Sequence, residues 1–214
     1  ELVNLAKSKP GQFTYGSSGT GSTQHLAGAL FGKISQIEIN HIPYKGSGQA
    51  IIDLLAGQIT MNFDTMPPVL EHIRAGKLRA LAISTPKRLD LLSQVPTFSE
   101  VGIQGFDVTN WYAIIGPKGM APEVVTKIDR AVRGAMSEPA IKATLDAQGL
   151  QTSGPSTPEA FGIFIKAELD KYSKMVKELN VEPIARLVNY AVANIPTKIM
   201  GIGPVKAIPK VLKQ

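Results

Sequence analysis

The sequence contains the stretch Phe13-Thr14-Tyr15-Gly16-Ser17-Ser18-Gly19-Thr20-Gly21-Ser22, in which a short strand lies directly before a glycine-rich turn. A helical pattern follows over residues 24–34, where apolar side chains recur every three or four positions. In α/β proteins such a turn lies at the carboxyl end of a parallel strand and leads into a helix. The sequence therefore indicates an α/β fold with a candidate ligand site in this turn.

The residues around this stretch repeat the alternation of strands and helices. A short helix is expected before it, over residues 1–9, and apolar patterns beyond it predict strands at 37–42, 59–63 and 78–83 with helices at 47–56 and 67–75. Strands that alternate with helices in so short a span predict a mostly parallel sheet.

The second half of the chain has a different pattern. Residues 84–105 contain Pro and Gly at intervals and predict a long connection with a short helix at 97–101. The elements expected beyond it are a strand at 111–116, helices at 122–136 and 139–148, a short strand at 150–152, and a long helix that Thr157 caps and Pro158 begins.

Composition excludes several classes of protein. The chain has 214 residues, of which 43% are hydrophobic and 19% charged, and no apolar run is long enough to span a bilayer, so we expect a globular protein that is not embedded in a membrane. It has 0 Cys, which excludes disulfides, thiolate metal sites and cysteine nucleophiles. The sequence starts at Glu1 without the pattern of a signal peptide, so we expect that processing or truncation has removed the natural start.

The net charge of +6 is concentrated near the end of the chain. Residues 184–214 contain five basic residues and no acidic ones, whereas the residues before them are nearly balanced. This change predicts a boundary at Pro183/Ile184. A solvated tail explains the charge, and because Tyr190 is the only aromatic residue in the tail, we expect no nucleic-acid partner.

The glycine-rich turn is the first candidate binding site. Its glycines allow a tight turn and a close approach to a ligand, and the helix that follows directs free N–H groups and a positive dipole end toward the same place. The turn suits a carboxylate or a phosphate, but it has neither the Lys of a nucleotide-binding P-loop nor the dinucleotide glycine spacing. A flexible loop with an N-cap serine is the alternative. The candidate residues are Gly16, Ser17, Ser18, Gly19, Thr20, Gly21 and Ser22.

Two further turns follow neighbouring strands of the predicted sheet. The second candidate is Tyr44-Lys45-Gly46-Ser47-Gly48, between the strand at 37–42 and the helix at 47–56, with Lys45 and Gly46 as its candidate binding residues. The third is Asp64, which follows the strand at 59–63. Because the carboxyl ends of parallel strands share one edge, we expect all three turns on one rim. The alternatives are a solvated Lys45 and an Asp64 that only caps the next helix.

The sequence offers few catalytic groupings. His25, His41 and His72 are far apart in the chain and fit no metal-binding motif, and no nucleophile elbow occurs. His25 lies one turn into the helix after the glycine-rich turn, where it either reaches an anion or packs as a structural histidine. Binding therefore fits better than catalysis, and no metal or cofactor is expected.

Several ordered motifs resemble one family. They are residues 9–19 (KPGQFTYGSSG), 25–28 (HLAG), 41–46 (HIPYKG), 53–59 (DLLAGQI), 75–82 (AGKLRALA), 95–97 (VPT) and the helix over 161–176. Together they resemble the extracytoplasmic solute receptors of tripartite tricarboxylate transporters, the Bug receptors, over residues 1 to about 182.

This resemblance implies a periplasmic-binding-protein-like fold of type II, in which two lobes close on a small carboxylate such as an organic, amino or aromatic acid. The resemblance also implies that the receptor is periplasmic and delivers its solute to a membrane permease. Family members also have an N-terminal stretch that forms most of the first lobe, and this chain lacks it. We therefore expect an incomplete receptor, with the complete second lobe and its connection in residues 1–104 and the C-terminal part of the first lobe in 105–183.

Residues 184–214 resemble a segment of thiolases, through Met200-Gly201-Ile202-Gly203-Pro204-Val205 and the residues around it. A fusion or a shifted reading frame explains this tail, and a divergent natural extension is the alternative. Two other functions stay open at this point. One is a fragment of a thiolase-like acyl-transfer enzyme without its cysteine nucleophile, and the other is a basic interaction module.

Overall fold

The computed structural model describes residues 1–152, 154 and 157–179. Its elements, in chain order, are α1 (Leu2–Ser8), β1 (Phe13–Ser17), α2 (Thr23–Ser35), β2 (Ile39–Pro43), α3 (Ser47–Leu55), β3 (Met61–Asn62), α4 (Met66–Arg74), the 3₁₀ helix η1 (Asp90–Leu92), α5 (Pro122–Ser137), α6 (Pro139–Ala147) and α7 (Pro158–Glu178). The expected thiolase-like tail at 184–214 lies outside the described residues.

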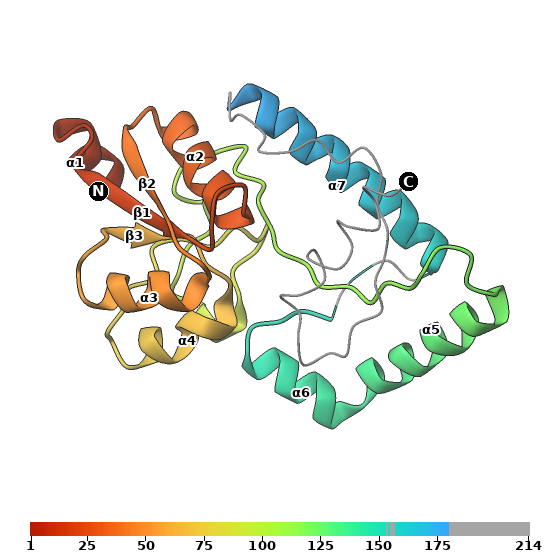
Figure 1. Cartoon of the computed structure of the whole chain (residues 1–214). Helices are drawn as coiled ribbons and strands as arrows, with labels where there is room; N and C mark the ends of the chain where they lie inside the picture. The colour runs from red at the N-terminus through yellow and green to blue at the C-terminus, as the bar shows by residue number, and fades with distance from the viewer. Residues whose placement is uncertain (153, 155–156, 180–214) are drawn as a thin grey trace.

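The three strands form a parallel sheet in the order β2-β1-β3. Strand β1 pairs with β2 from Phe13↔Ile39 to Ser17↔Pro43, and with β3 through Tyr15↔Met61. Figure 1 shows this sheet with its helices at one end of the molecule and α5 to α7 at the other. The expected α/β class with a parallel sheet is confirmed.

Successive residues of β1 face helices on opposite sides of the sheet. The ring of Tyr15 lies against Gly28 of α2, where any Cβ would be 2.1 Å from the ring. Gly16 faces the other side, where a Cβ would be 2.7 Å from Ile59 and 3.1 Å from Ala50 of α3. Successive strand residues point to opposite faces, so α2 and α3 cover opposite faces of the sheet.

An aromatic core lies on the α2 side. Phe31, Phe63, Phe98 and Phe106 form a chain of ring contacts, with the rings of Phe98 and Phe106 stacked at 3.9 Å between centroids. Met175 of α7 is buried in the same core. The long last helix is therefore attached to the sheet by its C-terminal end, although the two are distant in sequence.

Two expected elements between residues 78 and 101 are absent. The predicted strand at 78–83 makes only an isolated bridge, Ile83↔Thr97, because segment 96–98 rather than a strand of the sheet takes up its hydrogen bonds. The predicted helix at 97–101 is a single turn. Thr97 and Glu100 form a capping box, with Glu100 N–H donating to Thr97 Oγ1 and Thr97 N–H to the Glu100 carboxylate, but Gly102 at φ 84° ends the turn at once.

The predicted strands at 111–116 and 150–152 are also wrong for the described residues, where neither segment pairs with another strand. The apolar run at 111–116 has the composition of a strand, but a strand forms only when a neighbour takes up its backbone hydrogen bonds. Trp111 instead packs edge-on against Phe161 and Phe164 of α7 and donates from Nε1 to Glu168 at 3.0 Å.

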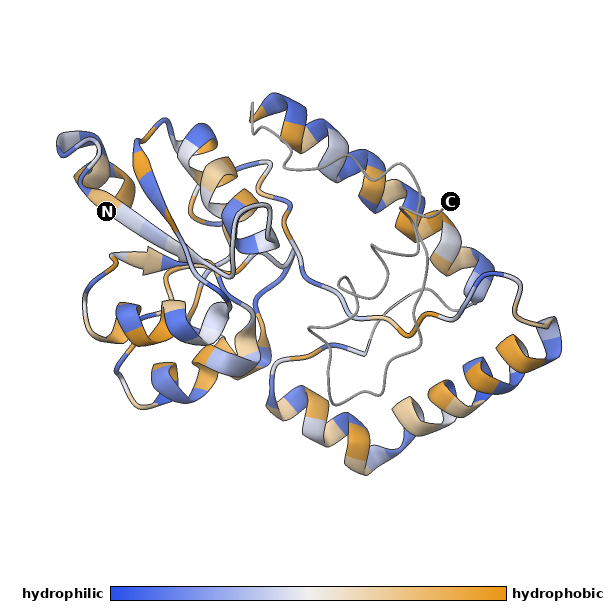
Figure 2. Ribbon diagram, in the orientation of Figure 1, coloured by the Kyte–Doolittle hydropathy of each residue, from blue (hydrophilic) through white to orange (hydrophobic). Residues whose placement is uncertain are grey.

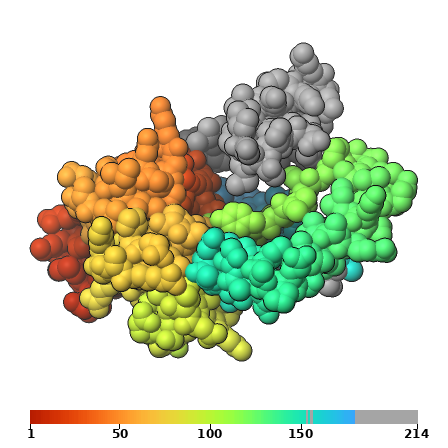
Figure 3. Space-filling model, turned by 90° about the horizontal axis from the view of Figure 1, so that it is seen from below, coloured from red at the N-terminus to blue at the C-terminus, as the bar shows by residue number. Residues whose placement is uncertain are grey.

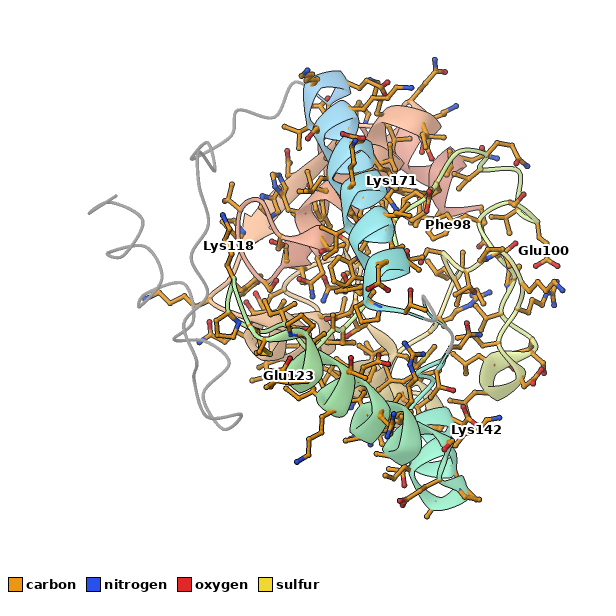
Figure 4. All side chains as sticks on the ribbon, turned by 90° about the vertical axis from the view of Figure 1, so that its right-hand side faces the viewer. Phe98, Glu100, Lys118, Glu123, Lys142 and Lys171 are labelled. Atoms are coloured by element: carbon orange, nitrogen blue, oxygen red, sulfur yellow. The ribbon has the colours of Figure 1, made fainter. Side chains whose placement is uncertain are left out.

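Helices α5 and α6 have no buried residue, and Figure 2 shows hydrophobic residues on their surfaces. In the space-filling view the surface of α6 borders the yellow surface of the residues around α4 (Figure 3). Gly149, which follows α6, lies against Met66 of α4. Lys171 projects from α7 and forms ion pairs with Glu168 and Asp107 (Figure 4).

Within the described residues, none of the helices combines the length and the hydrophobicity that crossing a bilayer requires.

Candidate functional site

Three turns meet at the carboxyl edge of the sheet. Residues 18–22 connect β1 to α2, residues 44–46 connect β2 to α3, and residues 63–65 connect β3 to α4. Because the strands are parallel and adjacent, each turn ends at the N-terminus of a helix on the same edge. The structure therefore brings together all three turns that the sequence singles out.

The glycine-rich turn is shaped by two positive backbone angles. Gly19 has φ 132° and Gly21 has φ 81°, conformations that side chains other than glycine rarely adopt. Ser22 is the N-cap of α2, and its Oγ accepts from the N–H of His25 at 3.2 Å. Within the described residues, the N–H groups of Thr20, Thr23 and Gln24 donate to no protein acceptor. The N-cap serine is thus present together with free donors for an anion.

Asp64 joins the three turns. Its carboxylate accepts from Gln24 Nε2 at 3.0 Å, Asn62 Nδ2 at 3.0 Å, the Thr65 N–H at 2.8 Å and the Ser47 hydroxyl. Gln24 continues the connection, because its Oε1 accepts from the N–H of Ser18 at 3.1 Å and from the Ser18 hydroxyl. Asp64 therefore does more than cap α4, whose N-cap is Thr65.

Gln24 is a site residue that the sequence analysis missed, and Ser47 belongs to the second candidate turn but was not singled out there as a binding residue. Gln24 is buried, with 8% of its surface exposed, although glutamine usually lies on a helix surface. Its position in the first turn of α2, next to the glycine-rich turn, is the only sequence signal that could have found it. Ser47 begins α3, where a serine ordinarily acts as a local cap.

His25 and His41 lie against each other, although they are distant in sequence. Their rings stack with centroids 3.9 Å apart. The Gly21 N–H donates to His25 Nδ1 at 3.1 Å, and His41 Nε2 lies 2.7 Å from the Oγ of the fully buried Ser17. Burial lowers the pKa of His25, and burial together with the neighbouring His25 lowers the pKa of His41 to about 4. Both rings are therefore neutral at pH 7.

The turn after β2 is held by its tyrosine. The Tyr44 N–H donates to the carbonyl oxygen of Ser17 at 3.1 Å, and the Tyr44 hydroxyl donates to Asp53 Oδ2 at 2.7 Å. Burial, followed by that hydrogen bond and the charge of Asp53, raises the pKa of Tyr44 to about 12. Lys45 is exposed and forms no ion pair with a described residue, and Gly46, at φ 144°, is the N-cap of α3.

The arrangement is chemically suited to holding an anion in place. It combines helix N-termini, free N–H groups, the exposed Lys45 and the carboxylate of Asp64, which accepts four hydrogen bonds within the protein. In the part of the chain that the structure describes, no three His, Asp or Glu side chains cluster as metal ligands would. Ser17 Oγ lies 2.7 Å from His41 Nε2, but Ser17 is fully buried, so its hydroxyl is not accessible to a substrate as a nucleophile must be.

Comparison with known proteins adds independent evidence. Residues 1–181 match the family described as "Tripartite tricarboxylate transporter family receptor". Protein BugT of Bordetella pertussis is 37% identical over 177 residues, which cover 83% of this chain and 54% of BugT. The solved structure of R. palustris Rpa4515 with adipate is 30% identical, with a TM-score of 0.79, and the match covers 86% of this chain and 61% of that one.

The structure of periplasmic binding protein BugD is 27% identical, with a TM-score of 0.77, over 85% of this chain and 61% of BugD. The expected periplasmic-binding-protein-like fold is thereby confirmed. The chain spans about half the length of the curated relative BugT and about three fifths of these solved structures.

A thiolase match is weaker. A 3-ketoacyl-CoA thiolase of Bacillus subtilis is 26% identical over 142 residues, which cover 66% of this chain and 34% of the thiolase. The matching family and the matching solved structures are receptors and binding proteins, not enzymes.

Proposed function

Because the chain belongs to the receptor family of tripartite tricarboxylate transporters, we propose that it binds a small carboxylate in the periplasm for delivery to the membrane permease of such a transporter. The convergence of the glycine-rich turn and three helix N-termini at one sheet edge is the observation that carries this proposal. The adipate in the R. palustris Rpa4515 structure supports a carboxylate ligand.

In this proposal the turn from Gly16 to Ser22 holds the solute carboxylate. The N–H groups of Thr20, Thr23 and Gln24 have no protein acceptor among the described residues, so a carboxylate gains hydrogen bonds there without displacing existing ones. Hydrogen bonds to an ionised group contribute about 1.5–3 kcal/mol each. The dipoles of α2, α3 and α4 favour a negative charge at the same edge.

Lys45 and Asp64 would have opposite roles around the solute. Lys45, exposed beside Gly46, is free to approach a second carboxylate of a diacid. Asp64 repels a carboxylate at close range, so it would face an amine or hydroxyl of the solute and otherwise keep the turns in register. We propose further that residues 1–104 form one lobe with its connection and that 105–183 belong to the other.

An NMR titration with a diacid tests the proposal, since it detects millimolar binding. Adipate added to the ¹⁵N-labelled chain should shift the amide signals of Thr20, Thr23 and Gln24 first. Gly19→Val should weaken binding by at least about tenfold, because Gly19 has φ 132° and a side chain there blocks the approach.

Gly134→Val on α5 is the matched control, because Gly134 lies outside these turns, has open space around its Cβ position and no positive φ. Unchanged affinity in Gly19→Val would remove the turn from the site. If no carboxylate in a panel of organic, amino and aromatic acids shifted any amide signal of these turns, the proposed function would be wrong.

A further inference from the structure

The proposed function assigns no contact with the solute to the two histidines of the sequence motifs at 25–28 and 41–46. His25 comes from the first turn of α2 and His41 from the middle of β2, and their rings stack at 3.9 Å with an angle of 19° between the planes. His25 contacts the β1–α2 connection at Gly21 through Nδ1, and His41 contacts Ser17, the last residue of β1, through Nε2.

His25 holds the turn at Gly21. The Gly21 N–H donates to His25 Nδ1 at 3.1 Å, so Nδ1 must be unprotonated and the proton of the neutral ring must be on Nε2. A protonated ring has N–H groups at both positions and would turn a donor toward the Gly21 N–H. That hydrogen bond therefore exists only while His25 is neutral.

His41 holds the turn at Gly19 through Ser17. The Ser17 Oγ accepts from the Gly19 N–H at 3.1 Å and donates to the Gly19 carbonyl at 3.0 Å. Either atom can be the donor in the 2.7 Å contact between His41 Nε2 and Ser17 Oγ, and we assign the proton to His41 Nε2, which leaves the Ser17 proton for the Gly19 carbonyl. The chain His41–Ser17–Gly19 thus fixes the residue whose φ is 132°.

We propose that His25 and His41 are paired positioning residues that hold the glycine-rich turn at Gly21 and Gly19, and that protonation of His25 releases the turn and weakens ligand binding. This inference rests on the proposed function only in assigning the ligand to the turn. The hydrogen bonds themselves do not depend on any ligand.

The surroundings of the pair disfavour a positive charge. Strand β1 contributes Tyr15, whose ring stacks on His41 at 5.0 Å and whose hydroxyl donates to the His25 carbonyl at 3.2 Å. Burial raises the pKa of Tyr15 to about 12, so it carries no charge. Among the described residues no carboxylate pairs with either imidazole, and Asp64 from the turn after β3 is bonded to Gln24 instead. Two stacked imidazolium rings would repel each other without compensation.

The tautomers of the His25 and His41 rings, measured in the unmodified chain, test the proposal. Imidazole ¹⁵N spectra at pH 7.5 should show neutral His25 with its proton on Nε2, and neutral His41 with its proton also on Nε2. As the pH falls through the titration of His25, hydrogen exchange at the Gly21 amide should accelerate by at least about tenfold beyond the intrinsic pH effect. A His25 proton on Nδ1 at pH 7.5 would overturn the proposal.

Two substitutions at one position separate positioning from packing. His25→Phe keeps a ring for the stack but has no acceptor, so exchange at Gly21 should accelerate about tenfold at pH 7.5. His25→Asn places Oδ1 near the former Nδ1, so protection of Gly21 should return and become independent of pH between 5 and 7.5. His72→Phe on α4 is the control and should leave Gly21 unchanged.

Binding of adipate separates this inference from the proposed function. As the pH falls from 7.5 to 5, adipate should lose more affinity for the unmodified chain than for His25→Asn, because the titration of the adipate carboxyl groups weakens binding equally in both proteins. If adipate and related acids fail to bind while Gly21 exchange behaves as described, the proposed function fails and the histidine pair stands. Equal protection of Gly21 in His25→Phe and the unmodified chain would disprove the positioning role.

Discussion

Gln24 and Asp64 are 40 positions apart in the sequence, yet Gln24 Nε2 donates to Asp64 Oδ1 at 3.0 Å. This hydrogen bond fastens the start of α2 to the turn that follows β3. With the bonds of Asp64 to Ser47 and Asn62, it fixes the spacing of the three turns at the edge of the sheet. The relative position of the turns is therefore set by side chains as well as by the pairing of three short strands.

Replacing Asp64 should destabilise the fold. Asp64→Asn puts an NH₂ group where a carboxylate oxygen accepts, so at least one of its four donors loses its partner. We expect the free energy of unfolding to fall by about 1–3 kcal/mol, as measured by urea denaturation. Asp146→Asn on α6 is the control, because Asp146 is exposed, and it should change stability by less than about 0.5 kcal/mol. Equal stability of the two variants would show that the Asp64 network is not structural.

Lys45 should contribute to binding by its charge. Lys45→Met should weaken binding of a diacid such as adipate by about two- to tenfold at low salt, because an exposed ion pair contributes about 0.2–1 kcal/mol and somewhat more when a ligand shields it. The loss should shrink as salt is added from about 20 to 300 mM. Lys87→Met, at an exposed position outside these turns, is the matched control. A loss that is equally large at both salt concentrations would contradict the electrostatic role.

The sequence predicts those helices, turns and strands whose formation depends on residues only a few positions apart. Residues 13–22 specify a strand, a turn and a helix because their apolar spacing, glycines and cap all act within a few positions, and the structure confirms each of them. Thr157 likewise accepts from the Ala160 N–H at 3.1 Å, as its position before Pro158 predicts. The expected strands at 78–83 and 111–116 failed because a strand also needs a neighbour, which no local pattern supplies.

The binding edge could be predicted only in part for the same reason. Parallel topology implies that three turns share one edge, so Asp64 and the glycine-rich turn could be placed together from the sequence. The stacking of His25 on His41 could not, because it depends on which helix residue faces which strand residue. Gln24 was missed because its burial depends on contacts with Ser18 and Asp64, and the sequence does not show that these three residues lie together.

Stability should decrease in mildly acidic solution because of His41. Its pKa is lowered from 6.5 to about 4, so between these values the unfolded chain binds a proton that the folded chain does not. The stability that neutral His41 contributes is therefore complete above pH 6.5 and is lost as the pH falls toward 4. Urea denaturation at pH 7, 6, 5 and 4.5 should show that the unmodified chain loses more stability than His41→Gln over this range.

His72→Gln is the control for this pH series. The His72 side chain makes no hydrogen bond within the described residues, so this variant should follow the unmodified chain at every pH. Parallel pH curves for His41→Gln and the unmodified chain would contradict the assignment, since carboxylates common to both proteins would then explain the whole effect.

The apolar segment at 111–116 should make the chain self-associate. Tyr112, Ile114 and Ile115 are 67%, 70% and 63% exposed, and within the described residues their backbone pairs with no strand. Neighbouring apolar side chains on an unpaired segment favour pairing with a second chain. We therefore expect the 214-residue chain to self-associate at about 100 μM, as measured by size-exclusion chromatography with light scattering.

The double substitution Ile114→Lys with Ile115→Lys should restore a monomer, because two charges oppose edge pairing. Ile52→Lys on α3 is the matched control, since Ile52 is 65% exposed but lies on a helix, and it should leave self-association unchanged. A monodisperse monomer of the unmodified chain at that concentration would refute the prediction, and an equal effect of Ile52→Lys would show that total charge rather than this segment controls self-association.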